Sequence, residues 1–227
     1  MAAQRHGLPD IGLIAFKEMS EAVHAVCRVS SLPIIVDCDT GYGGILNVRQ
    51  TVREFESAGA AGVQIEDQCW PKRCGHMQSK MIEPIKTAVD KIDAAVRARR
   101  NDDLVIVART DARDVLGFDE ALRRCKAYKA AGADMVCFHG PRSIEELRIL
   151  AAEIEGPHMV CIGEGEFTDG IEVAELFRLG FQFGLLPSSI LRTATFAVSA
   201  MLQNIKERAG GERGDTRPCR PRCRDLC

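Results

Sequence analysis

The residues best suited to chemistry form one short loop, Lys72-Arg73-Cys74-Gly75-His76, which follows Glu66-Asp67 and the apolar run 62–65. A cysteine set between cationic side chains is typical of a thiolate that faces an anionic substrate. The glycine lets the backbone approach a ligand closely. A solvated basic loop with an incidental cysteine is the alternative, and the position of the loop just after a predicted strand favours the catalytic interpretation.

Short apolar runs alternate along the chain with segments of helical period. Near-continuous apolar runs, each followed by a helix, are typical of a parallel sheet covered on both faces. The sequence predicts strands at 32–36, 62–65, 104–108, 135–138, 159–162 and 181–186. It predicts helices at 14–29, 47–58, 83–100, 118–131, 143–155, 171–179 and 190–208. Ala-Gly-Ala at 58–60 and 131–133 indicates helix C-caps that lead into the next strand.

Polar clusters follow five of these strands, at 37–41, 66–68, 109–112, 139–140 and 163–165. The carboxyl ends of parallel strands share one edge, and in a β/α barrel that edge is the active-site rim. A doubly wound sheet usually carries a G-x-G-x-x-G turn after its first strand. Gly41-Tyr42-Gly43-Gly44 lacks that spacing. We therefore predict an α/β fold of the TIM-barrel type.

Four segments resemble the isocitrate lyase and phosphoenolpyruvate mutase superfamily, and they occur in that family's order. The segments are 36–43, 64–68, 71–76 and 108–112, and Gly7-Leu8-Pro9-Asp10 also matches. The Lys-Arg-Cys-Gly-His loop resembles the lyase branch, most of all the 2-methylisocitrate lyases, because the mutases replace this cysteine. The resemblance runs from about residue 7 to residue 203 and implies a phosphoenolpyruvate-binding type of barrel.

An oxygen-rich pocket is predicted where two strands end. Asp37 and Asp39 stand two residues apart and so project to the same side. With Glu66 from the next strand they suit a hard divalent cation, and without one the two aspartates would repel each other. Mg²⁺ is the expected cofactor. The resemblance implies that some of these carboxylates hold it through water.

Cleavage of a carbon–carbon bond in a 2-hydroxy acid needs a base, a cation and an acid. The metal and Arg109 supply the cation. The resemblance assigns Cys74 as general acid, with its protonation state set by Lys72, Arg73 and His76. The base stays open between a metal-bound water, Glu66 and Asp10.

The predicted catalytic residues are thus Cys74, Lys72, His76, Arg109 and Glu66. The resemblance also implies a set of substrate-binding residues, which are Asp10, Arg73, Gly75, Arg109, His139, Cys161 and Pro187. Two alternatives stay open: Asp10 is the N-cap of the first helix, or Arg109 and Asp111 form a structural ion pair. Two positions depart from the family, since His139 replaces a usual glutamate and Cys161 a usual asparagine.

The strand count departs further, because six apolar runs are fewer than the eight strands of a closed barrel. The family begins with two additional strands, one of which carries a Tyr-x-Ser-Gly substrate motif. We therefore expect a barrel domain over 1–208 that lacks the first two strands. Residues 209–227 are rich in glycine, arginine, proline and cysteine, a composition that favours disorder. Three cysteines at 219, 223 and 227 make a poor zinc site without a fourth ligand.

The predicted function is that of a Mg²⁺-dependent lyase that cleaves a 2-hydroxy di- or tricarboxylate, such as 2-methylisocitrate, into a 2-oxo acid and a carboxylate. Within the same superfamily the alternatives are an oxaloacetate decarboxylase or hydrolase and a dimethylmalate lyase. A further alternative is an inactive truncated product that acts by pairing with a complete subunit. We expect a homo-oligomer, since relatives form tetramers.

Composition adds exclusions. At 227 residues and 46% hydrophobic, the chain suits one α/β domain. A net charge of −2 gives no sign of the basic surface expected of a nucleic-acid-binding protein. No apolar run has the length of a membrane span. Ten cysteines without a secretory signal predict reduced thiols, with Cys38, Cys137 and Cys161 as small buried hydrophobes. We expect a cytoplasmic protein, or a mitochondrial one if a longer N-terminus carries a transit peptide.

Overall fold

The computed structural model describes residues 2–210, in two compact units that divide between Pro187 and Ser188. The second unit is, in its described part, the helix α8 (Ser189–Gly210). Within this described range no helix combines the length and apolar character needed to cross a membrane. The predicted tail lies outside the described residues from position 211 onward, and so do its three cysteines.

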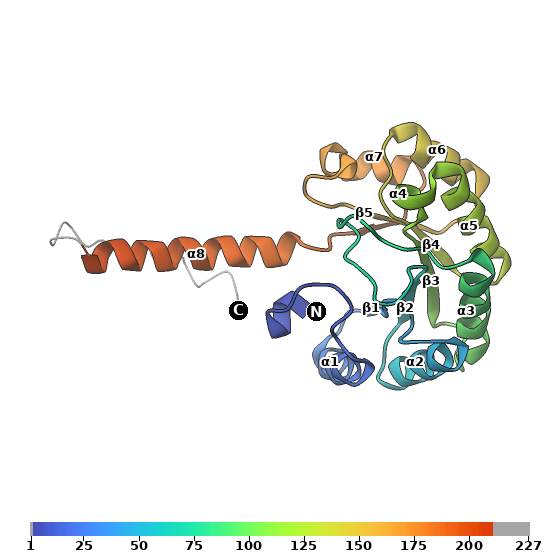
Figure 1. The fold of residues 1–227 in the computed structure, drawn as a ribbon, viewed down its shortest axis with the longest axis horizontal. Helices are drawn as coiled ribbons and strands as arrows, with labels where there is room; N and C mark the ends of the chain where they lie inside the picture. The colour runs from blue at the N-terminus through green and yellow to red at the C-terminus, as the bar shows by residue number, and fades with distance from the viewer. Residues whose placement is uncertain (1, 211–227) are drawn as a thin grey trace. The chain divides into compact units, whose positions relative to one another are not determined.

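Six parallel strands form the sheet of the first unit, and each pairs with the next strand along the chain (Figure 1). They are β1 (Ile35–Asp37), β2 (Gly62–Glu66), β3 (Val105–Thr110), β4 (Met135–Phe138), β5 (His158–Cys161) and β6 (Phe183–Leu185). A strand order that never reverses belongs to a barrel wall and not to a doubly wound sheet. The predicted fold class is confirmed as a curled half-barrel of six strands.

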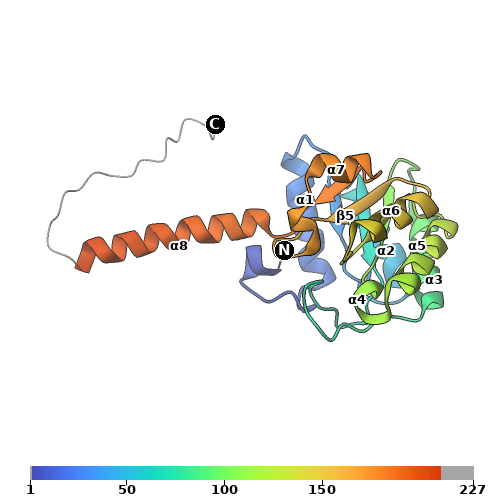
Figure 2. The same cartoon turned by 90° about the horizontal axis from the view of Figure 1, so that it is seen from above.

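Helices cover the outer side of this sheet (Figures 1 and 2). They are α1 (Phe16–Val29), α2 (Ile45–Ser57), α3 (Ile85–Ala98), α5 (Phe118–Ala130), α6 (Ile144–Glu153) and α7 (Val173–Arg178). All the predicted helices are present. Three short elements were not predicted because they are too brief to show a period: α4 (Ala112–Leu116), a π-helical turn (Ala2–His6) and a 3-10 turn (Phe167–Gly170).

The two Ala-Gly-Ala signals end helices as predicted. Ala58 and Ala131 are the C-caps of α2 and α5. Gly59 and Gly132 follow at φ 98° and 97°, in the left-handed region that favours glycine. The chain therefore turns sharply back toward the sheet, and β2 and β4 begin within three residues of these glycines.

The sheet buries apolar side chains on both faces. On the outer face, Phe55 and Val52 belong to a core between α1–α3 and the first strands, and Leu147 and Leu150 to a second core against β4 and β5. A smaller inner cluster contains Cys137 and Cys161, together with Val107, Met135 and Met159. The predicted burial of Cys38, Cys137 and Cys161 is confirmed at 0%, 0% and 1% exposure.

Candidate functional site

Five of the predicted site residues lie at one rim of the sheet, where the strands end. Asp37, Glu66 and Cys161 are the last residues of β1, β2 and β5. Arg109 is next to last in β3, paired in register with Glu66, and His139 follows β4 directly. Because strand side chains alternate between faces, these positions continue the inner row of Ile35, Val107, Cys137 and Met159. Strand order and register together bring these side chains to one place.

Arg109 forms a buried bidentate ion pair with Asp111. Its Nε donates to Asp111 Oδ2 at 2.8 Å and its Nη2 to Oδ1 at 3.0 Å. Glu66 Oε2 lies 3.5 Å from the same Nε. Burial alone would raise the pKa of Asp111, but the Arg109 guanidinium, aided by His139 and Lys80, holds it well below its usual range. The ion pair that the sequence left as an alternative is present, and it fixes the Arg109 fork at the rim.

Lys72 connects two carboxylates across the site. Its buried ammonium donates to Asp10 Oδ1 at 2.6 Å and to Asp39 Oδ1 at 2.7 Å. Burial, and then the charge of Asp37, raise the pKa of Asp39 to about 6 against the opposing effect of Lys72. Asp10 is not a helix N-cap, because α1 begins at Phe16 with Ala15 as its cap. The N-cap alternative is therefore wrong, and Asp10 belongs to the charged cluster.

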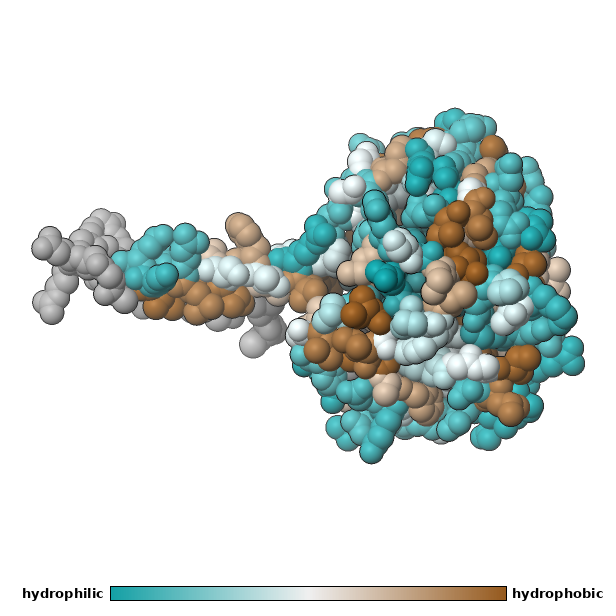
Figure 3. Space-filling view, in the orientation of Figure 1, coloured by the Kyte–Doolittle hydropathy of each residue, from teal (hydrophilic) through white to brown (hydrophobic). Residues whose placement is uncertain are grey.

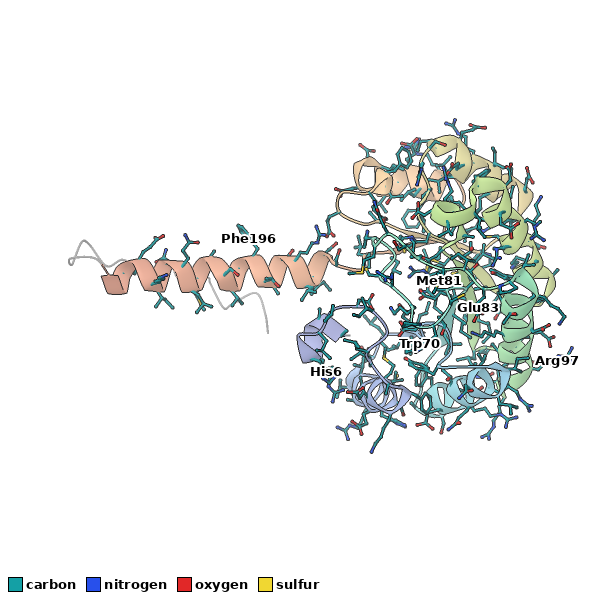
Figure 4. The ribbon with its side chains drawn as sticks, viewed as in Figure 1. His6, Trp70, Met81, Glu83, Arg97 and Phe196 are labelled. Atoms are coloured by element: carbon teal, nitrogen blue, oxygen red, sulfur yellow. The ribbon has the colours of Figure 1, made fainter. Side chains whose placement is uncertain are left out.

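Hydrogen bonds from the Gln68 side chain and from the backbone hold the loop that carries Cys74. The Gln68 amide donates to Arg73 O and accepts from Arg73 N, both at 2.9 Å. Cys74 N donates to Asp10 O at 2.9 Å. The Arg73 side chain itself is exposed. Trp70 and Met81 lie near the two ends of this loop, which connects β2 to α3 (Figure 4). Cys69 N donates to Met81 O at 2.7 Å and so joins the two ends.

Cys74 is a thiol at neutral pH. Burial raises the pKa of the Cys74 thiol above its ordinary value, although a hydrogen bond from the His76 backbone N–H and the charges of Lys72 and Arg109 act in the opposite direction. The thiolate expected from the flanking cations is thus a wrong prediction, because partial burial outweighs their charge. A protonated thiol can donate a proton, which is what a general acid requires.

Gly75 lets the loop pass close to the rim. A Cβ added there would lie 2.4 Å from the His139 ring and 2.8 Å from Arg109 Nη2. Lys80, which sequence reasoning missed, donates to Gly75 O at 2.5 Å and to Asp114 at 3.1 Å. Burial and the nearby Arg109 charge lower the pKa of His139 to about 4. His139 is therefore neutral at pH 7 and packs against the glycine.

His76 is paired with Glu166, a second residue that sequence reasoning missed. His76 Nδ1 lies 2.8 Å from Glu166 Oε1, and His139 Nε2 lies 3.8 Å from the same oxygen. The hydrogen bond to Glu166 raises the pKa of His76. The predicted rim cluster after β5 stopped at 165, one residue short. The sequence signal that could have identified Glu166 was its position, one residue after the polar cluster at 163–165.

Asp67 is the third missed residue and the most fully bonded carboxylate of the region. It accepts from Thr110 Oγ1 at 2.7 Å, Tyr128 OH at 2.7 Å, Asp111 N at 2.9 Å and Arg124 Nη1 at 3.2 Å. Its exposure is 2%. Asp67 thereby anchors the end of β3 on which the Arg109–Asp111 pair depends.

The predicted metal ligands are only partly assembled. Among residues 2–210 no group of three or more histidine, cysteine, aspartate or glutamate side chains is arranged to hold a metal. Asp39 is instead paired with Lys72. Glu66 Oε1, however, is buried and has no hydrogen-bond partner, and burial raises the pKa of Glu66. An orphaned carboxylate oxygen on a residue that also feels the charge of Asp37 fits a hard cation such as Mg²⁺ in donor type and charge.

Two predicted substrate contacts lie further along the rim. Cys161 is buried at the end of β5, and its hydrogen bond with the Cys137 thiol lowers its pKa. Cys161 is near enough to Arg109 and His76 to influence the pKa of both. Pro187 is exposed two residues after β6, at the edge of the sheet opposite β1. The structure therefore places Cys161 beside the charged cluster and leaves Pro187 at the margin.

Comparison with known proteins gives consistent matches over most of the chain. A family model described as phosphoenolpyruvate phosphomutase matches residues 1–206. The chain is 42% identical over 205 residues to a 2,3-dimethylmalate lyase of Eubacterium barkeri, covering 90% of this chain and 71% of the relative. It is 42% identical over 201 residues to a 2-methylisocitrate lyase of Aeropyrum pernix, covering 88% of this chain and 65%, less than two thirds, of the relative.

Solved structures agree. A 2,3-dimethylmalate lyase structure, described as a PEP mutase/isocitrate lyase superfamily member, matches with a TM-score of 0.88 at 33% identity and covers 95% of this chain and 73% of that one. An oxaloacetate acetylhydrolase in complex with 3,3-difluorooxalacetate matches with a TM-score of 0.87 at 31% identity, over 95% and 75%. A phosphonopyruvate hydrolase complex with oxalate and Mg²⁺ matches with a TM-score of 0.80 at 27% identity, over 92% and 72%.

Proposed function

The chain belongs to the phosphoenolpyruvate mutase/isocitrate lyase superfamily and to its carbon–carbon lyases, and from this we propose that it cleaves a 2-hydroxy di- or tricarboxylate of the 2-methylisocitrate type. The observation that carries the proposal is the placement of the Cys74 loop at the charged rim, where Lys72 pairs with Asp10 and Asp39 and Gly75 lies against Arg109; burial keeps the pKa of the Cys74 thiol above its ordinary value. An acid next to cations is what carbanion protonation and carboxylate binding both require.

The proposed reaction divides between these groups. The bond between the hydroxyl-bearing carbon and its neighbour breaks, and the hydroxyl carbon becomes the carbonyl of a 2-oxo acid. The electron pair stays on the α-carbon of the departing carboxylate, which takes a proton from Cys74. Arg109 and Lys72 bind substrate carboxylates. The hydroxyl proton passes to a carboxylate base, Glu66 or Asp10, of which Asp10 is paired with Lys72.

We further propose that Mg²⁺ is held by Asp37, Asp39 and Glu66. The orphaned Glu66 oxygen supports this, as does the Mg²⁺ and oxalate complex of the related hydrolase. When bound, the ion supplies a Lewis acid for the charge that develops on the substrate oxygen. Titration calorimetry with Mg²⁺ should show binding that Asp37→Ala and Asp39→Ala abolish. The exposed control Asp102→Ala should bind as the unmodified protein does, and equal binding in all four proteins would contradict the assignment.

The substrate test compares three acids in the presence of Mg²⁺: 2-methylisocitrate, 2,3-dimethylmalate and oxaloacetate. We expect a 2-oxo acid to form fastest from 2-methylisocitrate. Oxaloacetate hydrolysis is the second candidate, favoured by the TM-score of 0.87 to the acetylhydrolase. Release of oxalate from oxaloacetate as the fastest reaction would replace the first proposal by the second, and no turnover of any of the three would reject both.

The described residues also support assembly into a homo-oligomer. Helix α8 exposes large apolar side chains, visible as brown patches along it in Figure 3: Ile190, Phe196, Val198, Met201, Leu202 and Ile205. Exposed apolar surface of this kind marks interaction sites. Light scattering should give the mass of more than one chain, and a monodisperse monomer would contradict this part of the proposal.

A further inference from the structure

Glu166 occupies the space between two histidines of the site. It lies in the loop after β5, one residue before the 3-10 turn Phe167–Gly170. Its Oε1 is 2.8 Å from His76 Nδ1 and 3.8 Å from His139 Nε2. Its side chain is 18% exposed, and its Oε2 is buried. The carboxylate therefore points inward, although most acidic loop residues point to water.

Two glycines make room for this arrangement. A Cβ at Gly163 would lie 2.7 Å from Glu166 Oε2 and 2.8 Å from His76 Cε1. A Cβ at Gly75 would lie 2.4 Å from the His139 ring. The backbone thus approaches both sides of the histidine–glutamate cluster, and any side chain at Gly163 would displace the hydrogen-bonded pair.

The surrounding charges give this cluster its electrostatic character. His76 faces Glu166, Cys161 and Arg109. Glu166 faces His76, His139 and Arg109. His139 faces Arg109, Asp111, Glu166 and Lys80. Glu166 is thus the carboxylate that the two imidazoles share.

We propose that Glu166 is a positioning residue for the lyase reaction proposed above: from the loop after β5 it fixes the ring of His76, whose backbone N–H lies at the Cys74 thiol. The inference rests on the proposed function for its kinetic part.

The consequence is a cationic His76 over part of the neutral pH range. The Glu166 hydrogen bond raises the pKa of His76, so the imidazolium persists to higher pH than in an isolated histidine. A cation there adds to Arg109 and Lys72 in binding substrate carboxylates. Activity should therefore decline as the pH rises through the pKa of His76.

The direct test measures the titration of His76 by NMR in protein labelled at histidine, with its signal identified by its absence in His76→Asn. In Glu166→Gln we expect the His76 pKa to fall toward its ordinary value. Asp169→Asn is the matched control, because Asp169 carries the same charge, lies exposed in the same loop and only caps Gly165 N at 3.0 Å. An unchanged His76 titration in Glu166→Gln, or an equal fall in the control, would overturn the proposal.

A second variant keeps the test open if Glu166→Gln does not fold. Gly163→Ala keeps every charge and places a methyl group 2.7 Å from Glu166 Oε2 and 2.8 Å from His76 Cε1, so that the hydrogen-bonded pair must shift and the His76 pKa should fall here too. In both variants kcat/KM should decrease about tenfold or more, and its decline at high pH should begin at lower pH. Loss of activity without a shifted pH profile would show a merely structural role. The NMR titration needs no substrate. It therefore tests the pairing of Glu166 with His76 even if the lyase assay shows no activity.

Discussion

Cys74 shows how burial and charge compete at a single atom. Two cations lie close enough to stabilise its thiolate, yet burial keeps the thiol protonated. The same competition has the opposite outcome at Asp111, where the Arg109 fork overcomes burial and keeps the carboxylate ionised. The difference lies in contact: Asp111 receives two hydrogen bonds from its cation, whereas Cys74 interacts with Lys72 and Arg109 through charge.

The role of Cys74 as acid is tested by Cys74→Ser. The hydroxyl keeps the size of the side chain but holds its proton much more tightly than a thiol does. Turnover should drop roughly 10²-fold or more, while calorimetry should still detect binding of the substrate. Cys69→Ser, on the same loop, is the matched control and should retain turnover. Undiminished turnover in Cys74→Ser would remove the residue from the mechanism.

His139 predicts a pH dependence of stability. Its folded pKa is about 4 and its ordinary value is 6.5, so between these limits the unfolded chain binds a proton that the folded protein does not. The free energy of unfolding should therefore decrease as the pH is lowered from 6.5 toward 4. Urea unfolding at several pH values should show a shallower decrease in His139→Gln. The exposed control His6→Gln should keep the original slope, and identical slopes in all three proteins would argue against a neutral buried His139.

At the scale of elements, the strand ends and helix ends were predictable because their signals are local. Apolar runs gave all six strands, and the glycines at 59 and 132 gave two helix ends. Side-chain partners were less accessible. Asp67 bonds to Tyr128, which lies 61 residues away in the chain, and Glu166 approaches His76 only because β5 lies near the Cys74 loop. Such pairs depend on the packing of elements, which no short pattern encodes.

The anchoring of β3 by Asp67 gives a stability prediction. In Asp67→Asn one acceptor oxygen becomes a donor amide that faces hydrogen-bond donors, so the loss should be about 1–3 kcal/mol. Tyr128→Phe removes one donor and should cost about 1 kcal/mol. The surface pair of Asp90 with Lys86 provides the control, since Asp90→Asn should cost less than about 1 kcal/mol. Equal urea midpoints for Asp67→Asn and Asp90→Asn would exclude the anchoring role.

The whole first unit combines two different interiors. Its outer core joins helices to the sheet through apolar side chains, while its inner row changes from apolar residues to charged ones toward the strand ends. Each buried charge of that rim meets an opposite one, as Lys72 meets Asp39 and Arg109 meets Asp111. Burying ions is costly unless they are paired, so the arrangement depends on every member remaining in place.

The chain-order pairing of the strands has a further consequence for amide hydrogen exchange. Strands β3 and β4 are flanked on both sides, whereas β1 and β6 each have one neighbour in the described sheet. Local opening of a protein begins where few contacts hold it. Exchange with deuterium should therefore be slowest for amides such as those of Ile106 and Val136 and fastest along β6, whose residues are the least buried of the sheet. Uniform protection across the strands would contradict this. A graded pattern would mean that β6 can open locally while the strands that carry Arg109 and its neighbours remain hydrogen-bonded.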